Sequence, residues 1–228
     1  MLGLAGGSEM GKIIGFATYS NWRKRQMTDT KYEQLLSRLE KHPANDYSVR
    51  KAEILADEVL EAGGYSDIQG AVPILKIVRG FGITPFSIEN LSAEYSGNIY
   101  IGGTTKDIYG TDKAIVVGDN EEPYHKRFIV AHEFAHYMLD YVGSKYYQDE
   151  MELFTKAYLK SGHDSEENER RADRFAAELL MPAKIFLKYY AAAILESNNL
   201  EEYIITFLSE LFEVKQSSVR RRMKELGL

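Results

Sequence analysis

The chain has 228 residues, with 28 lysine and arginine side chains against 34 aspartate and glutamate side chains, so its formal charge is −6. This length can bury one sizeable core, and the acidic balance argues against bulk nucleic-acid binding as the main activity. The chain has no cysteine, which excludes disulfides and thiolate metal ligands and favours the reducing cytoplasm. No apolar run reaches the ~18 residues of a membrane span, and a secretory signal is not expected.

The first third of the chain predicts an extension followed by two helices. Residues 1–45 form an N-terminal extension of unknown role, in which residues 30–41 have the apolar spacing of a short helix. A longer helix is expected to start after Ser48, whose hydroxyl group can cap the first turn, and to stop at the Gly63-Gly64 pair. A short helix should then start at Pro73, because proline suits the first helical turn.

Three short segments rich in β-branched and aromatic residues follow, separated by glycines. They are residues 83–88, 98–101 and 114–117. Segments of this length and composition between turn residues are typical of strands. The sequence therefore predicts a small, three-stranded, antiparallel sheet, with residues 98–102 as a candidate for its edge.

The pentapeptide His132-Glu133-Phe134-Ala135-His136 lies in a strongly apolar stretch that predicts a helix over residues 123–141. Residues four apart project from one face of a helix, so both imidazoles can bind one ion, with Glu133 beside them. Two imidazoles suit zinc, and the adjacent carboxylate can act as a general base. The alternative is a pair of surface histidines, but histidines without partners are costly to bury in so apolar a segment.

A zinc hydrolase needs a third protein ligand, and the best candidate here is Glu169. Residues 165–180 predict a helix whose apolar stripe recurs at intervals of three and four residues. The stripe consists of Ala172, Phe175, Ala176, Leu179 and Leu180. Glu169 continues this stripe and Glu166 is the second choice, whereas Glu178 faces the opposite side and is expected in solvent. The alternative for Glu169 is an ordinary surface glutamate.

Other polar residues have supporting roles in this interpretation. Asp173 shares the face of Glu169 and is placed to accept the N–H of a ligand histidine, which would fix the orientation of the ring. His163 lies in a predicted loop and is either a surface histidine or a contact for a substrate oxyanion. Arg222 and a tyrosine of the cleft are further candidates for that oxyanion contact. His125, near the start of the pentapeptide helix, is expected to be partly exposed.

The C-terminal region predicts helices over residues 182–195 and 200–212, followed by a basic tail. Residues 214–228 carry five basic side chains and one acidic side chain, and their apolar spacing is similar to the second half of a helix-turn-helix unit. Such a unit can place a basic helix in a DNA groove, or it can be a packed helical pair with a solvated basic face. We favour the packed pair, or a surface that docks a protein partner, over DNA recognition.

Three stretches of the sequence resemble the ImmA/IrrE family of metallo-endopeptidases. They are residues 128–139 around the pentapeptide, residues 169–182, which end in Phe-Ala-Ala-Glu-Leu-Leu-Met-Pro, and, with weaker similarity, residues 212–228. In the last stretch Lys215 stands where the family usually has serine. The order Glu-x-x-Ala-Asp is also found in thermolysin-like zinc peptidases, whose ligands are His, His and Glu. The resemblance begins near Ser48 and leaves the N-terminal extension outside.

The resemblance implies a zinc endopeptidase that cleaves a helix-turn-helix repressor, encoded on a mobile element or in a stress-response locus. On this basis His132, His136 and Glu169 would hold Zn²⁺, and Glu133 would be the general base. The substrate would lie extended along a sheet edge above the metal, held by main-chain hydrogen bonds. Residues 98–102 are the candidate for that edge.

The sequence as a whole predicts an α+β fold that is mostly helical, with the pentapeptide helix in the core. Residues 46–182 are expected to form the zinc metallopeptidase domain, and residues 183–228 a helical, helix-turn-helix-like region. The rival interpretation is a regulator that binds DNA or a protein and keeps a structural or idle zinc site. A purely structural site would not need Glu133 and would close its fourth position. A small-peptide aminopeptidase is a weaker alternative. Neither nucleic acid as the main partner nor a membrane is expected.

Overall fold

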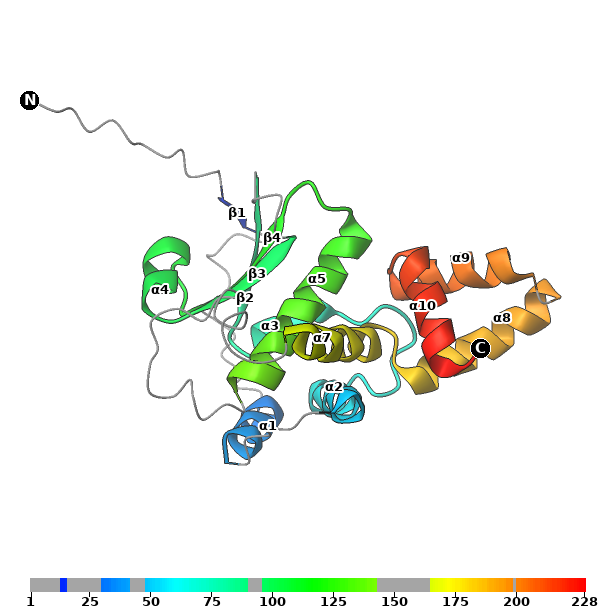
Figure 1. Cartoon of the computed structure of the whole chain (residues 1–228), viewed down its shortest axis with the longest axis horizontal. Coiled ribbons are helices and arrows are strands. Elements are labelled where there is room, and N and C mark those ends of the chain that lie inside the picture. The colour runs from blue at the N-terminus through cyan, green and yellow to red at the C-terminus, as the bar shows by residue number, and fades with distance from the viewer. Residues whose placement is uncertain (1–12, 16–29, 42–47, 90–95, 143–164, 199) are drawn as a thin grey trace, which may run out of the picture.

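The computed structural model describes residues 13–15, 30–41, 48–89, 96–142, 165–198 and 200–228. A small sheet lies beside a layer of helices, and the last three helices are grouped at the other end of the molecule (Figure 1). In chain order the elements are β1 (Ile13–Gly15), α1 (Thr30–Lys41), α2 (Val49–Gly63), α3 (Ile74–Gly80), β2 (Thr84–Ile88), β3 (Gly97–Ile101), α4 (Gly103–Tyr109), β4 (Lys113–Gly118), α5 (Pro123–His136), the π-helical turn η2 (Tyr137–Tyr141), α7 (Ser165–Leu180), α8 (Ala183–Ser197), α9 (Glu201–Phe212) and α10 (Gln216–Leu226).

The strands form a mixed sheet in the order β1-β2-β4-β3. β2 and β4 are parallel, with Phe86 opposite Val116, whereas β1 and β3 run antiparallel to their neighbours. The predicted α+β class and the three predicted strands are confirmed, but the expected antiparallel arrangement is wrong for the central pair. The long stretch between β2 and β4 supplies the crossover that parallel strands need. Within the described residues β3 is an edge strand, as expected, and β1 adds a fourth strand from the N-terminal extension.

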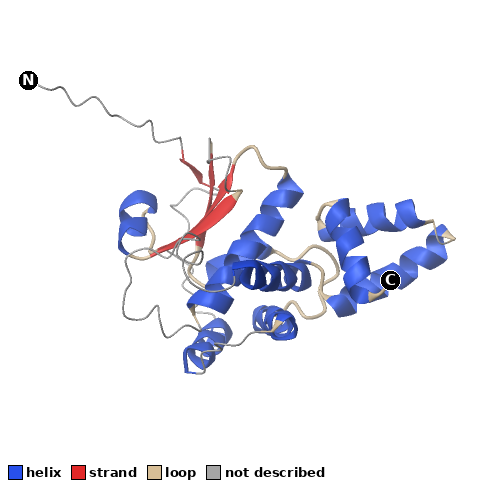
Figure 2. Ribbon diagram, in the orientation of Figure 1, coloured by secondary structure: helices blue, strands red, loops and turns tan. Residues whose placement is uncertain are grey.

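Helix α5 packs against β3 and β4 on one side and against α7 on the other (Figure 2). Pro123 occupies its first turn, where the missing N–H of proline costs no hydrogen bond. Every residue from Ile129 to His136 is buried, because the sheet and α7 together cover the second half of the helix. A helix covered in this way belongs to the core, which confirms the predicted position of the pentapeptide.

Helix α7 lies between α5 and α2. The predicted apolar stripe of α7 is buried throughout, and its Phe175 ring lies 5.9 Å from the ring of Phe134 on α5. Burial of one such phenylalanine contributes about 1.5–3 kcal/mol to folding. The ends of α2 are those predicted, since Ser48 caps the first turn by accepting the Lys51 N–H, and Gly64 closes the helix in the left-handed conformation.

Among the C-terminal helices, α9 packs against both α8 and α10, and the rings of Phe186 on α8 and Phe212 on α9 are stacked 5.7 Å apart. Their buried residues belong to the same hydrophobic cluster as those of α5 and α7. The packed helical arrangement predicted for this region therefore forms, and its apolar interior is continuous with that of the rest of the protein.

Two parts of the chain differ from the sequence predictions or cannot be compared with them. The short helix α4 was not predicted, because its Thr-rich sequence lies among segments with strand character. The sequence also predicts a helix over residues 151–159, and these residues lie outside the part of the chain that the structure describes. Among the helices that the structure describes, none has both the length and the apolar character needed to cross a membrane.

Candidate metal centre

Helix α5 brings two imidazoles to one point. The Nε2 atoms of His132 and His136 lie 3.2 Å apart, and their rings meet nearly edge to face. The spacing of four residues produces this meeting, because it places the side chains one helical turn apart on the same face. Both side chains are well buried, at 11% and 1% exposed, so they are fixed by their surroundings.

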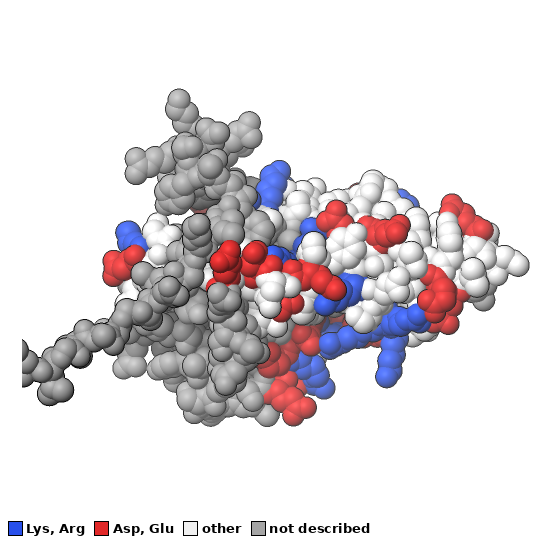
Figure 3. Space-filling view, turned by 90° about the horizontal axis from the view of Figure 1, so that it is seen from above, with Lys and Arg blue, Asp and Glu red and all other residues white. Residues whose placement is uncertain are grey.

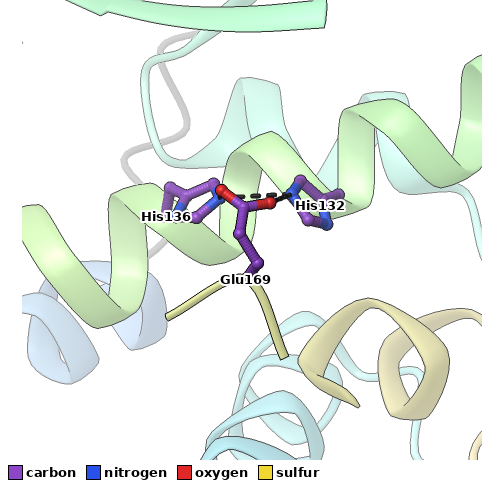
Figure 4. Close-up of side chains that lie close together, drawn as sticks. All are labelled: His132, His136 and Glu169. Atoms are coloured by element: carbon purple, nitrogen blue, oxygen red, sulfur yellow. Dashed lines mark hydrogen bonds and ion pairs between the residues drawn. The ribbon is translucent and has the colours of Figure 1, made fainter. Parts of the chain in front are cut away.

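Glu169 reaches the same point from α7, as its place on the apolar stripe predicts (Figure 4). Its Oε2 lies 3.1 Å from Nε2 of His132, and its Oε1 lies 3.6 Å from Nε2 of His136. One donor atom from each of the three residues lies within 4.8 Å of the others. The side chain of Glu169 is 40% exposed, so this residue marks the solvent side of the site.

The opposite nitrogen of each imidazole contacts a carboxylate. Nδ1 of His132 lies 3.0 Å from Asp173, and Nδ1 of His136 lies 2.7 Å from Asp140. Since a carboxylate only accepts hydrogen bonds, both Nδ1 atoms carry the proton in these contacts. In the neutral rings both Nε2 atoms then present a lone pair toward the oxygens of Glu169. Because lone pairs and carboxylate oxygens repel one another, this arrangement favours a cation between them.

Asp173 is held in its ionised form by its partners. Burial opposes ionisation, but the hydrogen bond from His132 and the charge and hydrogen bond of Arg221 outweigh it, so the pKa of the Asp173 carboxyl lies below its usual value. Arg221 donates from α10 to the second oxygen of Asp173 over 3.0 Å. The C-terminal helix thus contacts a group that orients one of the imidazoles.

Glu133 lies between helix α5 and the edge strand β3. Its side chain is 2% exposed, and a Cβ added to Gly97 of β3 would come within 3.6 Å of its Cγ. On the same strand, burial and then the charge of Glu133 raise the pKa of Tyr100. The added Cβ would overlap Cγ2 of Ile129 on α5, so Gly97 lets the sheet edge approach helix α5 more closely than any other residue would allow.

A cavity of about 370 Å³ lies between α5, α7 and α10. Apolar side chains such as Phe128 and Met181 line it together with polar ones such as Ser218 and Arg221. None of the three donor residues lines this cavity, but its wall residue Phe128 has its ring 6.3 Å from that of His132.

The arrangement fits a tetrahedral divalent cation. With metal–nitrogen distances of about 2.0–2.1 Å, tetrahedral donors lie roughly 3.3 Å apart, close to the 3.2 Å between the two Nε2 atoms. Two nitrogens and one carboxylate oxygen leave a fourth position available, which is the composition of a catalytic rather than a structural site.

The sequence was compared with family models and with curated proteins. The model of peptidase family M78, described as the IrrE N-terminal-like domain, matches residues 96–224, which is more than half of the chain. The chain belongs to this family. Membership assigns it a metallopeptidase-type activity, and hence a protein or peptide substrate. The resemblance found in the sequence begins near Ser48, whereas the match to the family model begins at residue 96, next to the edge strand β3. The match then continues through the helices that hold the donor cluster and into α10. No curated protein matches the chain.

The structure places the remaining predicted residues of this M78-family chain in different surroundings. Glu166, the second choice for the third ligand, is exposed and lies outside the donor cluster. His125 is partly exposed, as expected, and contacts Glu121 over 2.6 Å. His163 lies outside the described residues. Arg222 is 1% exposed and bonds the carbonyl of Met181 over 3.1 Å, so it serves a buried network and not the donor cluster.

Two polar residues have positions that the sequence did not predict. Glu178, expected in solvent, is 4% exposed and pairs with Arg222, because α10 covers the side of α7 opposite the stripe. Asp140 was not among the predicted site residues, although it follows His136 by four residues and thus lies one turn further along the same face. The spacing of four residues from His136 could therefore have identified Asp140 from the sequence.

Proposed function

We propose that this M78-family protein is a zinc-dependent endopeptidase and that its substrate is a helix-turn-helix transcriptional repressor. The observation that carries the peptidase part is the convergence of His132, His136 and Glu169 beside the buried Glu133. Two imidazole nitrogens together with a carboxylate oxygen suit zinc better than the harder cations, which prefer oxygen ligands alone. The repressor rests on the resemblance to the ImmA/IrrE family, and the lack of cysteine is compatible with the reducing cytoplasm where repressors act.

The residues of the site have separate roles in this proposal. His132, His136 and Glu169 hold the ion, which supplies Lewis-acid activation of water and of the peptide carbonyl. Glu133 accepts the proton of the attacking water and returns it to the leaving amide nitrogen. Asp173 orients the ring of His132 by accepting a hydrogen bond from its Nδ1–H over 3.0 Å.

The edge strand β3 is the proposed binding surface for the substrate backbone. It runs past Glu133 at Gly97, and an extended peptide could pair with its outer side through main-chain hydrogen bonds that do not depend on side-chain identity. The cavity beside Phe128 could take a substrate side chain next to the scissile bond.

The alternative of a DNA-binding regulator receives little support from the basic tail. The three consecutive arginines of α10 each pair with carboxylates of the same chain. Acidic and basic side chains are interspersed on the face seen in Figure 3. The division into an extension (1–45), a peptidase domain (46–182) and a C-terminal helical region (183–228) stays a prediction.

The experiment is a cleavage assay with a purified candidate repressor, zinc and a chelator, combined with metal analysis. Glu133→Gln should keep zinc and lose cleavage, whereas His136→Ala and Glu169→Ala should bind zinc weakly. Cleavage by Glu133→Gln at the parental rate would exclude Glu133 as the base. Tight, full zinc occupancy in Glu169→Ala would move the third ligand elsewhere. DNA retention that survives chelation, with no cleavage, would favour the regulator.

A further inference from the structure

The carboxylate of Asp140 faces the metal ligand His136 from the far side of the ring. Its Oδ2 lies 2.7 Å from Nδ1 of His136, which is a short distance for an N–H···O contact to a charged acceptor. Asp140 belongs to the π-helical turn η2, in which the Val142 N–H donates to the carbonyl of Tyr137. π-Helical turns are rare and frequently lie at functional sites.

This contact is more enclosed than the corresponding contact of the other imidazole. Asp140 is 8% exposed and His136 is 1% exposed, whereas Asp173 and His132 are 27% and 11% exposed. A hydrogen bond to a charged acceptor is strengthened where water is excluded. The ring of His136 therefore has less freedom than the ring of His132, and Asp140 is the group that fixes it.

Asp140 also connects the two helices that carry the metal ligands. Its second oxygen, Oδ1, lies 3.6 Å from the guanidinium of Arg171, whose side chain is 14% exposed. Arg171 lies on α7, two residues after Glu169. The Asp140 carboxylate therefore contacts both His136 at the end of α5 and Arg171 on α7, and so it links the two helices that carry the metal donors.

We propose that Asp140, supported by Arg171, is a positioning residue of the metal centre: it holds His136 in the tautomer that presents Nε2 to the ion and fixes the distance between the ligand helices. The inference rests on the proposed metallopeptidase function. It adds a residue that does not touch the substrate and acts through its contacts with His136 and Arg171. Groups that orient a metal-bound imidazole commonly contribute 10- to 100-fold to metal affinity.

The test is the zinc affinity of Asp140→Asn, measured by competition with a chromophoric chelator. The variant keeps the size of the side chain but loses its charge, so we expect zinc to bind about 10- to 100-fold more weakly. The matched control is Glu121→Gln. Glu121 makes the same kind of contact with His125, over 2.6 Å and at the same spacing of four residues, but away from the donor cluster. The control should bind zinc as the parent does.

A second measurement uses the unmodified protein and does not depend on whether the variant folds. Nitrogen-15 NMR of the zinc-loaded chain should show His136 with its proton on Nδ1 and its metal on Nε2. Circular dichroism of metal-free Asp140→Asn shows whether the helical fold is kept. Failure of the parent chain to bind zinc would overturn the proposed function itself. Parental zinc affinity in a folded Asp140→Asn, or an Nδ1 of His136 without a proton, would overturn the role of Asp140 alone.

Discussion

Replacement of Arg222 by methionine should destabilise the protein strongly without touching the donor cluster. The Arg222 guanidinium is 1% exposed and pairs with Glu178, whose side chain is 6% exposed. Glu178 also accepts the backbone N–H of Ala183 at the start of α8, over 2.8 Å. In Arg222→Met the carboxylate of Glu178 stays in place but loses its counter-charge. The variant therefore leaves an uncompensated charge among three helices.

The expected magnitude follows from the burial of both partners. Removal of one member of a buried ion pair costs about 3–5 kcal/mol, because the remaining charge keeps its desolvation penalty. Domains commonly have a free energy of unfolding of about 5–15 kcal/mol, so this is a large fraction of the total. For a chain of about this size, each kcal/mol lowers the unfolding temperature by about 2–4 °C. Arg222→Met should therefore unfold about 6–20 °C below the parent.

The assay is urea and thermal unfolding followed by circular dichroism, with Arg220→Met as the control. Arg220 lies two residues earlier on the same helix and pairs with Glu201 and Glu202 at the surface, where ion pairs contribute little. The double variant Arg222→Met with Glu178→Gln should recover part of the loss, since the most buried carboxylate that pairs with Arg222 is then neutral. If Arg222→Met were as stable as Arg220→Met, the idea that Arg222 serves a buried network would be refuted.

Three further outcomes follow from the structure. Gly97→Ala should lower kcat/KM about 10- to 100-fold, because the added Cβ would overlap Cγ2 of Ile129 and push the edge strand away from α5. Its zinc affinity in chelator competition should be unchanged. An unchanged kcat/KM would show that the close approach of β3 to α5 is not needed for cleavage. Burial, followed by the charge of Glu178, raises the pKa of Asp57 from 3.8 to about 6, so folding stability should fall as pH rises through that window. Asp57→Asn should flatten this fall in urea unfolding at several pH values. We expect a change of about 1 kcal/mol and not the ~3 kcal/mol of a full two-unit shift, because the residue is partly exposed to solvent. An equal slope in the variant would contradict the assignment. In a thermal scan, zinc at about a thousand times its Kd should stabilise the parent by about 4 kcal/mol and His136→Ala far less. Equal stabilisation of the two proteins would show that the ion binds elsewhere.

Features that depend on one helix could be predicted from the sequence because helical periodicity links spacing to direction. The spacing of four residues is enough to place His132 and His136 on a common face. The apolar stripe of residues 165–180 gives the phase of α7, and Glu169 falls on that stripe at the right end. The helix ends at Ser48 and Gly64 follow from capping chemistry that involves neighbouring residues only.

Features that depend on the packing of several elements could not be obtained in this way. β4 lies between β3 and β2 in the sheet, and it pairs in parallel with β2, which is not the strand next to it in the sequence. The composition of a strand does not reveal which other strand it will pair with. Glu178 lies opposite the stripe and was expected in solvent, but α7 is covered on that side too. Its burial depends on Arg222, which lies 44 residues further along the chain.

The basic tail shows why the charge of a segment is a poor guide to its partners. Summed along the sequence, residues 214–228 look suited to a polyanion. In the fold most of the basic groups contact carboxylates that the chain itself supplies, so the charge available to a ligand is much smaller than the formal charge. The pairs are Lys215 with Glu122, Arg220 with Glu201 and Glu202, Arg221 with Asp173 and Glu225, and Arg222 with Glu178. Two of these arginines contact α7, the helix that carries Glu169, and so the tail contributes to the rigidity of the donor cluster more directly than to the binding of an external anion.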